Sequence, residues 1–220
     1  MDRQRVAACI SLLEEQYGIP HLDERDPVDL LIMTILSQNT SDTNSLRAFA
    51  LLKSAFCDYE KVLVASDEAV ADSIRVGGLA EIKARRIKEA LSKIKQDAGT
   101  ISLSFLADME KDGAMAYLLS LPGVGPKTAS VVLLFAFSMP FLPVDTHVYR
   151  VSRRLGLLCE DVRLEKAQPI LELIVPVEKY LSLHLNLITH GRLICRAQYP
   201  RHEECALHGC CDYYLHGQKP

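Results

Sequence analysis

Apolar residues recur at helical spacing along nearly the whole chain, and this pattern limits the possible folds more than any other feature. It is clearest over residues 79–98, where charged residues fill the other face of the helix and glycines stand at both ends. Alternation of apolar and polar residues, which would predict strands, is nowhere convincing. The apolar positions of the clearest segment include Leu79, Ile82, Ile87, Leu91 and Ile94. The sequence therefore predicts an all-α fold.

Capping residues mark where several of these helices begin. The pair Asp26-Pro27 combines a favoured N-cap with proline at the first helical position, and it opens the apolar run 28–35. Ser41, Asp58 and Ser66 offer further N-caps. In the second half of the chain, we expect helices over about residues 146–155, 164–174 and 178–190, the last one ending at Gly191.

Composition limits the class of protein. A length of 220 residues with 49% apolar residues provides enough material for a substantial core. The amino terminus, Met1–Arg5, is charged, and no uninterrupted apolar run reaches membrane-spanning length. We therefore expect a soluble cytoplasmic protein that has no membrane partner and is a monomer. The formal net charge is -3, so binding of nucleic acid must rely on local groups rather than on bulk attraction.

The seven cysteines of the chain are unevenly distributed. Cys195, Cys205, Cys210 and Cys211 crowd into the tail, and the other three are scattered. An odd count with this crowding indicates metal ligands rather than disulfides.

A glycine turn lies near the middle of the chain, where residues 121–130 read Leu-Pro-Gly-Val-Gly-Pro-Lys-Thr-Ala-Ser. Gly123 and Gly125 permit positive φ and a close backbone approach, so the amides between two helices could converge on one phosphate oxygen. Thr128 falls in the first turn of the next helix, where its hydroxyl can help to satisfy free amides. A bare Gly-x-Gly between helices is also typical of an ordinary helix-helix turn.

A lysine and an aspartate near this turn are candidates for catalysis. Lys127 opens an apolar helix, where the positive end of the helix dipole disfavours its ammonium form, as would an apolar pocket. An uncharged amine is the form that attacks carbon. Asp145, in the segment Val144–His147, could assist that amine, and it also has the position of an N-cap. The two roles are compatible.

Together, these motifs resemble those of the helix-hairpin-helix and Gly/Pro-Asp class of DNA glycosylases, and most closely the endonuclease III family. The resemblance extends over residues 26–212. It implies a helical barrel domain over 24–134 that contains the helix-hairpin-helix. It also implies a discontinuous helical domain, 1–23 plus 135–220, with a C-terminal metal cluster at 195–211. The lesion would lie in a cleft between the two lobes.

The resemblance also implies a bifunctional DNA glycosylase and AP lyase. Lys127 would be the nucleophile, and Asp145 would assist its deprotonation and stabilise the cationic sugar. Monofunctional relatives generally carry another residue in place of the lysine. The expected partner is duplex DNA with damaged bases, most simply oxidised pyrimidines, or with abasic sites. A glycosylase for mismatched or deaminated bases and a non-catalytic DNA-binding module are the alternative interpretations.

Base excision requires the nucleotide to be rotated out of the stack. Similarity to the endonuclease III family implies that two residues take part in this step. Gln38 would enter the vacated space, and Leu79 would wedge the opposite strand. Each also has a plain structural interpretation, as a polar helix end and as a core residue. Further candidate phosphate contacts are Lys83, Arg85, Arg86, Arg150, Arg153, Arg154 and Arg196.

The family's iron-sulfur loop has four cysteines separated by six, two and five residues. Here Cys195-x6-His202-x2-Cys205-x5-Cys211 keeps this spacing with one exchange. The resemblance implies a 4Fe-4S cluster with Cys3His ligation, and a structural zinc ion is the alternative, because Cys3His is also a common zinc set. Cys210 could replace His202 as the fourth ligand, and tail cysteines without a metal remain a further possibility.

Overall fold

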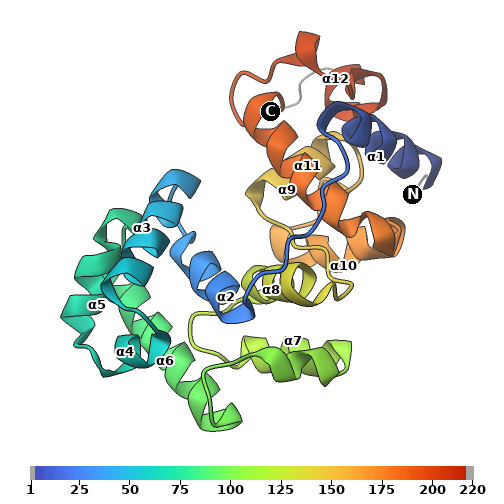
Figure 1. Cartoon of the computed structure of the whole chain (residues 1–220). Helices are drawn as coiled ribbons and strands as arrows, with labels where there is room; N and C mark the ends of the chain where they lie inside the picture. Colours follow the sequence, from blue (N-terminus) through green and yellow to red (C-terminus); the bar gives the residue numbers. More distant parts are fainter. Residues whose placement is uncertain (1–2, 217–220) are drawn as a thin grey trace. The chain divides into compact units, whose positions relative to one another are not determined.

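The structure of the chain, a computed structural model, describes residues 3–216 and is dominated by helices (Figure 1). No residue in this range belongs to a β-strand, which confirms the predicted all-α fold. The chain divides into two compact units, one being Asp23–Met139 and the other Met1–Leu22 with Pro140–Pro220. The first of these units ends at Met139, whereas its end was expected from the sequence at residue 134. The later boundary keeps the whole of α8, Pro126–Phe137, in one unit. In the described range, no helix combines the length and apolarity needed to cross a membrane.

The unit Asp23–Met139 is built from α2 to α8. The helices are α2 Pro27–Leu36, α3 Asp42–Ala55, α4 Tyr59–Val64, α5 Asp67–Ile74, α6 Ala80–Ala98, α7 Lys111–Leu119 and α8 Pro126–Phe137, with short 3-10 helices η1 Arg75–Gly77 and η2 Ser104–Asp108. The predicted N-caps are confirmed, because each of the four side chains accepts a backbone N–H from the residue three positions on. In the core of this unit, α2 packs against α8, and α5 packs against α6.

Helix α6 differs from the prediction at its amino-terminal end. Ile87, Leu91 and Ile94 are fully buried, as the apolar spacing predicts. Leu79 and Ile82 are instead 50% and 45% exposed, and the helix begins only at Ala80. Leu79 has φ of 52°, a left-handed conformation that does not continue into a helix. An apolar side chain is therefore held out toward solvent on a backbone conformation rare for such a residue.

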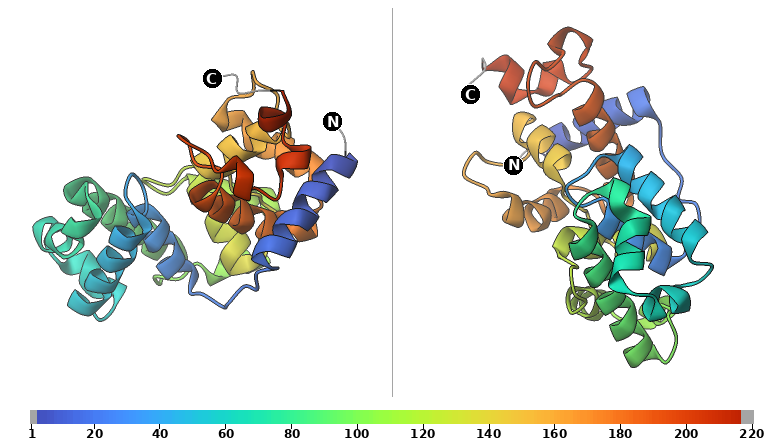
Figure 2. Two further views of the ribbon diagram at one scale, coloured as in Figure 1. Left: turned by 90° about the horizontal axis from the view of Figure 1, so that it is seen from above. Right: turned by 90° about the vertical axis from the view of Figure 1, so that its left-hand side faces the viewer.

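The other unit joins both ends of the chain. Its helices are α1 Arg3–Tyr17, α9 Thr146–Arg154, α10 Leu164–Ile174, α11 Tyr180–Leu193 and α12 Asp212–Leu215, with 3-10 helices η3 Val177–Lys179, η4 His202–Glu204 and η5 His208–Cys210. Helix α11 packs against both α1 and α9 (Figures 1 and 2). The expected helix end at Gly191 is wrong, since α11 continues to Leu193. A Cβ at Gly191 would lie 3.1 Å from the side chain of His147, so this glycine allows α9 to approach rather than ending the helix.

Candidate active site and metal cavity

The turn between α7 and α8 uses its two glycines differently. Gly123 has φ of +77°, and a Cβ there would meet Cδ of Arg86 at 2.6 Å, so both the backbone and the packing require glycine. Gly125 has φ of -103°, which any residue adopts, and an added Cβ would meet no atom within 4 Å. Gly125 is the N-cap of α8, a position that glycine favours over most apolar residues, but neither backbone strain nor packing demands glycine there. The missing side chain leaves open space at the start of α8, where free amides and the helix dipole favour an anion.

Lys127 follows directly in the first turn of α8, after Pro126, and its side chain is half-buried. The positive end of the helix dipole disfavours an ammonium at this position. Val124 and Ala129 are buried, so the turn is packed onto the core of its own unit. Thr128 is 4% exposed, which places its side chain in the interior rather than on the surface. The buried side chains of Val124, Thr128 and Ala129 thus anchor the turn and the start of α8.

Asp145 is the N-cap of α9. Its Oδ1 accepts hydrogen bonds of 2.8 Å from the backbone N–H groups of both His147 and Val148. Two residues earlier, the carbonyl of Pro143 accepts a 2.8 Å hydrogen bond from the ring of His184, which is buried. Two amides of α9 therefore orient the carboxylate, and the hydrogen bond to Pro143 fixes the backbone that precedes it. The capping interpretation is confirmed, and it is compatible with a role in catalysis.

Gln38 lies against the glycine turn within the unit Asp23–Met139. Its Nε2 donates a 3.1 Å hydrogen bond to the carbonyl of Gly123, and its Oε1 accepts a 3.2 Å hydrogen bond from Arg86. Three parts of the chain, the end of α2, the first half of α6 and the α7–α8 turn, thus meet around one amide. The link through Arg86 was not predicted, because the two residues are 48 positions apart and no local pattern connects them.

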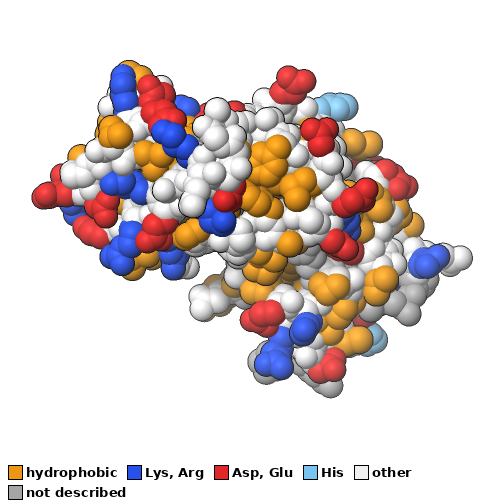
Figure 3. Space-filling model, turned by 90° about the horizontal axis from the view of Figure 1, so that it is seen from below, with side chains coloured by type: hydrophobic (Ala, Val, Ile, Leu, Met, Phe, Trp, Pro, Cys, Tyr) orange, Lys and Arg blue, Asp and Glu red, His pale blue; other side chains and the backbone are white. Residues whose placement is uncertain are grey.

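Arg150 and Arg196, two of the predicted phosphate contacts, have different surroundings. The guanidinium of Arg150 donates to the carbonyls of Gly191 at 2.8 Å and Cys195 at 3.2 Å, which ties α9 to the start of the predicted metal loop. Arg196, in that loop, has an exposed side chain. On the face shown in Figure 3, basic and acidic side chains are intermingled. With a formal net charge of -3, DNA contacts depend on particular residues rather than on a broad basic field.

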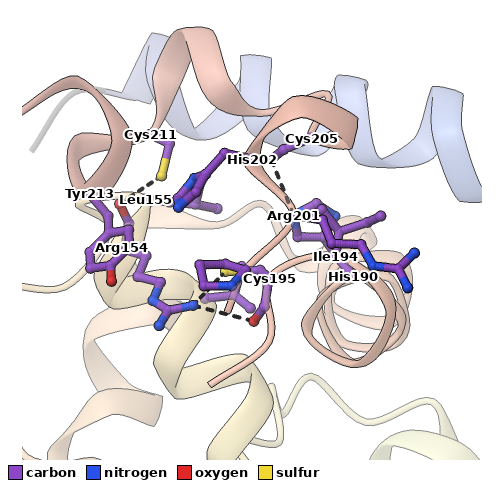
Figure 4. Close-up of a pocket in the computed structure, with 12 residues that line it drawn as sticks. Arg154, Leu155, His190, Ile194, Cys195, Arg201, His202, Cys205, Cys211 and Tyr213 are labelled. Atoms are coloured by element: carbon purple, nitrogen blue, oxygen red, sulfur yellow. Dashed lines mark hydrogen bonds between the residues drawn. The ribbon is translucent and has the colours of Figure 1, made fainter. Parts of the chain in front are cut away.

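The four predicted metal ligands line one small cavity within their unit (Figure 4). Cys195, at the end of α11, lies on one side, and His202, Cys205 and Cys211 come from the loop that follows. Cys210 is not among the lining residues, since its Sγ faces that of Cys9 at 3.3 Å. The structure therefore separates the two adjacent cysteines.

The donor set of three cysteines and one histidine has the chemistry of either a 4Fe-4S cluster or a structural zinc ion. Zinc needs its ligand atoms within about 2.3 Å of one point. Among the described residues, no three His, Cys, Asp or Glu side chains are grouped closely enough to hold one metal ion. A 4Fe-4S cluster takes one ligand on each iron, so its four ligands do not converge on a single point.

Two further side chains of the cavity were missed by sequence reasoning. Arg154 donates to Sγ of Cys195 at 3.3 Å, and His190 lies 3.5 Å from Sγ of Cys205 (Figure 4). Burial lowers the pKa of His190 to about 4, so its ring is neutral at physiological pH. Such contacts orient metal ligands and tune their basicity. Only the folded chain brings these residues together, although His190 does stand close to Cys195 in sequence.

Comparison with known proteins decides the family. Residues 32–176 match the model of the HhH-GPD superfamily base excision DNA repair proteins. The endonuclease III of Sulfolobus acidocaldarius is 34% identical, and the match covers 84% of this chain and 81% of the relative. The endonuclease III of Thermotoga maritima is 35% identical, and the match covers 87% of this chain and 85% of the relative. The chain belongs to the endonuclease III family. A longer relative, a putative DNA glycosylase of Arabidopsis thaliana, is 36% identical, and the match spans 58% of its length.

Solved structures of endonuclease III agree with this assignment. A trapped covalent intermediate of endonuclease III with DNA is 30% identical, with a TM-score of 0.83 and 98% of both chains covered. A non-covalent endonuclease III–DNA complex gives a TM-score of 0.84 at the same identity and coverage. The helix-hairpin-helix glycosylase fold is thus confirmed. As a member of the endonuclease III family, the protein is a DNA-binding glycosylase with AP lyase activity.

Proposed function

We propose that this endonuclease III family protein excises oxidised pyrimidines from duplex DNA and then cuts the strand at the abasic site, with Lys127 as nucleophile and Asp145 as its partner. One observation carries the proposal. Lys127 stands in the first turn of α8, directly after a turn that Gly125 leaves open. A lysine there is disfavoured as an ammonium and lies next to amides suited to a phosphate.

The chemistry begins at C1′ of the damaged nucleotide. The lone pair of Lys127 Nζ forms a bond to C1′ while the bond to the base breaks, and the base leaves with the electron pair and takes up a proton. The carboxylate of Asp145 accepts the proton from the lysine and stabilises positive charge on the sugar. Ring opening then gives a Schiff base. Removal of a proton from C2′ and departure of the 3′ phosphate cut the strand by β-elimination.

Residues around the turn would hold the DNA. Gly123 and Gly125 bring backbone amides to a phosphate, and the buried Thr128 supports the turn from the interior. Gln38 fills the space left by the rotated nucleotide, and the exposed Leu79 wedges the opposite strand. Arg150 and Arg196 are the proposed phosphate contacts of the other unit.

Reductive trapping tests the catalytic roles. With borohydride, the wild type should form a covalent adduct with DNA containing an abasic site, because reduction fixes the Schiff base. Lys127→Gln should form none. An undiminished adduct in that variant, or its absence in the wild type, would exclude Lys127 as the nucleophile. A panel of duplexes with oxidised, deaminated and mismatched bases tests the substrate class. If the protein cuts deaminated or mismatched duplexes faster than oxidised ones, the assignment to oxidised pyrimidines is wrong.

We also propose that Cys195, His202, Cys205 and Cys211 hold a 4Fe-4S cluster that fixes the loop carrying Arg196. Adjacent cysteines provide a matched test. Cys211→Ser should lose iron and sulfide, whereas Cys210→Ser should retain both, because Cys210 faces Cys9 outside the cavity. Zinc in place of iron in the purified wild type would contradict the cluster, and loss of iron in Cys210→Ser would contradict the ligand set.

The protein is expected to be a monomer by size-exclusion chromatography with light scattering.

A further inference from the structure

Lys83 on α6 is almost completely buried, with 1% of its surface exposed. Its Nζ donates a 2.7 Å hydrogen bond to the carbonyl of Leu36 and a 2.9 Å hydrogen bond to the carbonyl of Gly77. The prediction that Lys83 contacts phosphate is therefore wrong. Its positive charge is directed into the unit Asp23–Met139 rather than toward solvent.

A buried lysine is costly, so its retention needs an explanation. Desolvation disfavours the ammonium, and burial accordingly lowers the pKa of Lys83. An apolar residue of similar length would fill the same volume without this cost. What such a residue could not do is donate to two carbonyls. Leu36 is the last residue of α2, and Gly77 is the last residue of η1, where carbonyls lack donors from within their own helix.

The two bonded carbonyls precede the two residues proposed to open the duplex. Gln38 lies two positions after Leu36, and Leu79 lies two positions after Gly77. The second segment is conformationally demanding, because Gly78 has φ of 70° and Leu79 has φ of 52°. Such a backbone persists only where the surroundings hold it. The ammonium group of Lys83 thus bonds both segments just before the residues that are proposed to enter the DNA.

We propose that Lys83 is a positioning residue for strand opening, which fixes the segment of Gln38 relative to the segment of Leu79 so that both enter the duplex together. The inference rests on the proposed roles of these two residues. Arg86, one turn further along α6, acts on the same assembly through its hydrogen bond to Gln38. The first half of α6 thereby links Gln38, which would fill the gap, to Leu79, which would wedge the opposite strand.

Lys88 on the same helix offers a matched control. Its Nζ donates a 2.6 Å hydrogen bond to the carbonyl of Ala65, which follows the end of α4, and it pairs with Asp67. It therefore also bonds a helix-end carbonyl, but in a segment with no proposed DNA contact. Lys83→Met and Lys88→Met each remove one ammonium and keep a long apolar side chain. Comparing them separates strand opening from general support of helix ends.

The experiment compares two substrates that differ in their need for opening. Excision from a duplex lesion requires rotation of the nucleotide, whereas borohydride trapping on a single-stranded abasic site does not. Lys83→Met should lower duplex excision about tenfold and single-strand trapping less than about twofold, a selective loss of transition-state stabilisation. The fluorescence of 2-aminopurine beside the lesion, which reports unstacking, should fall in parallel. Lys88→Met should keep the wild-type ratio of the two rates.

The outcomes are distinguishable. Equal losses on both substrates, or no loss on the duplex, would overturn the role of Lys83 and leave the lysine nucleophile intact. A wild type that forms no trapped adduct with an abasic site in either duplex or single-stranded DNA would overturn the proposed function itself, and the inference with it. Lys83→Gln is the second variant in case Lys83→Met does not fold, because its amide can still donate to one carbonyl. It should show an intermediate duplex loss, and a wild-type ratio in this variant would also overturn the proposal.

Discussion

Two glycines separated by a single valine show how the same residue type serves folding at one position and function at the other. At Gly123 the positive φ and the contact with Arg86 are internal requirements of the chain. At Gly125 the backbone is ordinary and the surrounding space is open. Their substitution should therefore affect different properties, although the sequence motif treats them alike.

We expect Gly123→Ala to lower the free energy of unfolding by about 1–3 kcal/mol, because the left-handed backbone and the crowded Cβ both add strain. Gly125→Ala should lower it by no more than about 1 kcal/mol, since neither cause applies and only the weaker N-cap propensity of alanine remains. The latter variant should instead bind duplex DNA more weakly, as its methyl group occupies the space proposed for a phosphate. Urea denaturation and DNA-binding titrations check both. Wild-type affinity in Gly125→Ala would contradict the phosphate site.

Asp145 combines a cap that is observed with a catalytic role that is proposed, and two substitutions separate them. Asparagine is as good an N-cap as aspartate but carries no charge, so Asp145→Asn should keep wild-type stability and lose about a hundredfold in base excision. Asp145→Ala should lose activity and also about 1 kcal/mol of stability. Thermal denaturation and single-turnover kinetics measure the two effects. A fully active Asp145→Asn would restrict this residue to capping.

At the scale of helices, features that depend on neighbours in sequence were predictable, and features that depend on distant contacts were not. The N-caps Asp26, Ser41 and Ser66 need only the next few residues, and the structure confirms them. Gly191 was taken for a helix end because its partner on α9 is remote in sequence. Lys83 was assigned to the surface for the same reason, since its partner Leu36 is 47 positions away.

The candidate site follows the same division. The resemblance predicted, from spacing along one loop, four residues that the structure places around one cavity. It could not decide between His202 and Cys210, whereas the fold directs Cys210 toward Cys9. Gln38 accepts a hydrogen bond from Arg86 and donates one to the carbonyl of Gly123, and both partners belong to other segments of the unit. The candidate residues could thus be predicted from local spacing, whereas the orientation of their side chains depends on packing between distant segments.

Docking of α1 on the rest of its unit involves Glu14, whose carboxylate accepts hydrogen bonds from Lys179 at 2.8 Å and Ser182 at 2.5 Å. Burial raises the pKa of Glu14, but these two hydrogen bonds and the nearby lysine charge outweigh it, and the net pKa lies below the ordinary value of 4.5. The ionised form is therefore favoured by folding. Its contribution is complete above the unfolded pKa and is lost as pH falls through the folded pKa.

Glu14→Gln should accordingly lower the free energy of unfolding by about 1 kcal/mol at neutral pH, where the charged hydrogen bonds are fully formed. The difference from the wild type should shrink as pH falls below 4.5, the ordinary value, because protonation then removes the same charge from the wild type. Urea denaturation from pH 3 to 7 measures this difference (about four pH units suffice to cover the transition). A difference that stays constant with pH would mean that the charge of Glu14 contributes nothing.

For the whole molecule, charge limits how DNA is bound. The chain has 25 basic and 28 acidic residues, and the two kinds are intermingled on the face of Figure 3. Long-range attraction is therefore weak, and affinity has to come from the amides of the glycine turn and from a few cations such as Arg196. Backbone amides do not neutralise phosphate charge and so release few of the counterions condensed on DNA, which leaves the cations as the source of salt dependence.

The salt dependence of duplex binding should therefore be shallow, with a slope of log K against log salt smaller in magnitude than about 5. Arg196→Ala should reduce that magnitude by about 1, because each phosphate contact that is lost releases about one counterion fewer. Arg163→Ala is the control, since Arg163 is equally exposed and lies outside the proposed contacts. Binding titrations over a range of salt concentrations measure both variants. An unchanged slope in Arg196→Ala would remove this arginine from the interface, and a steep slope in the wild type would show that cations rather than the glycine turn dominate binding.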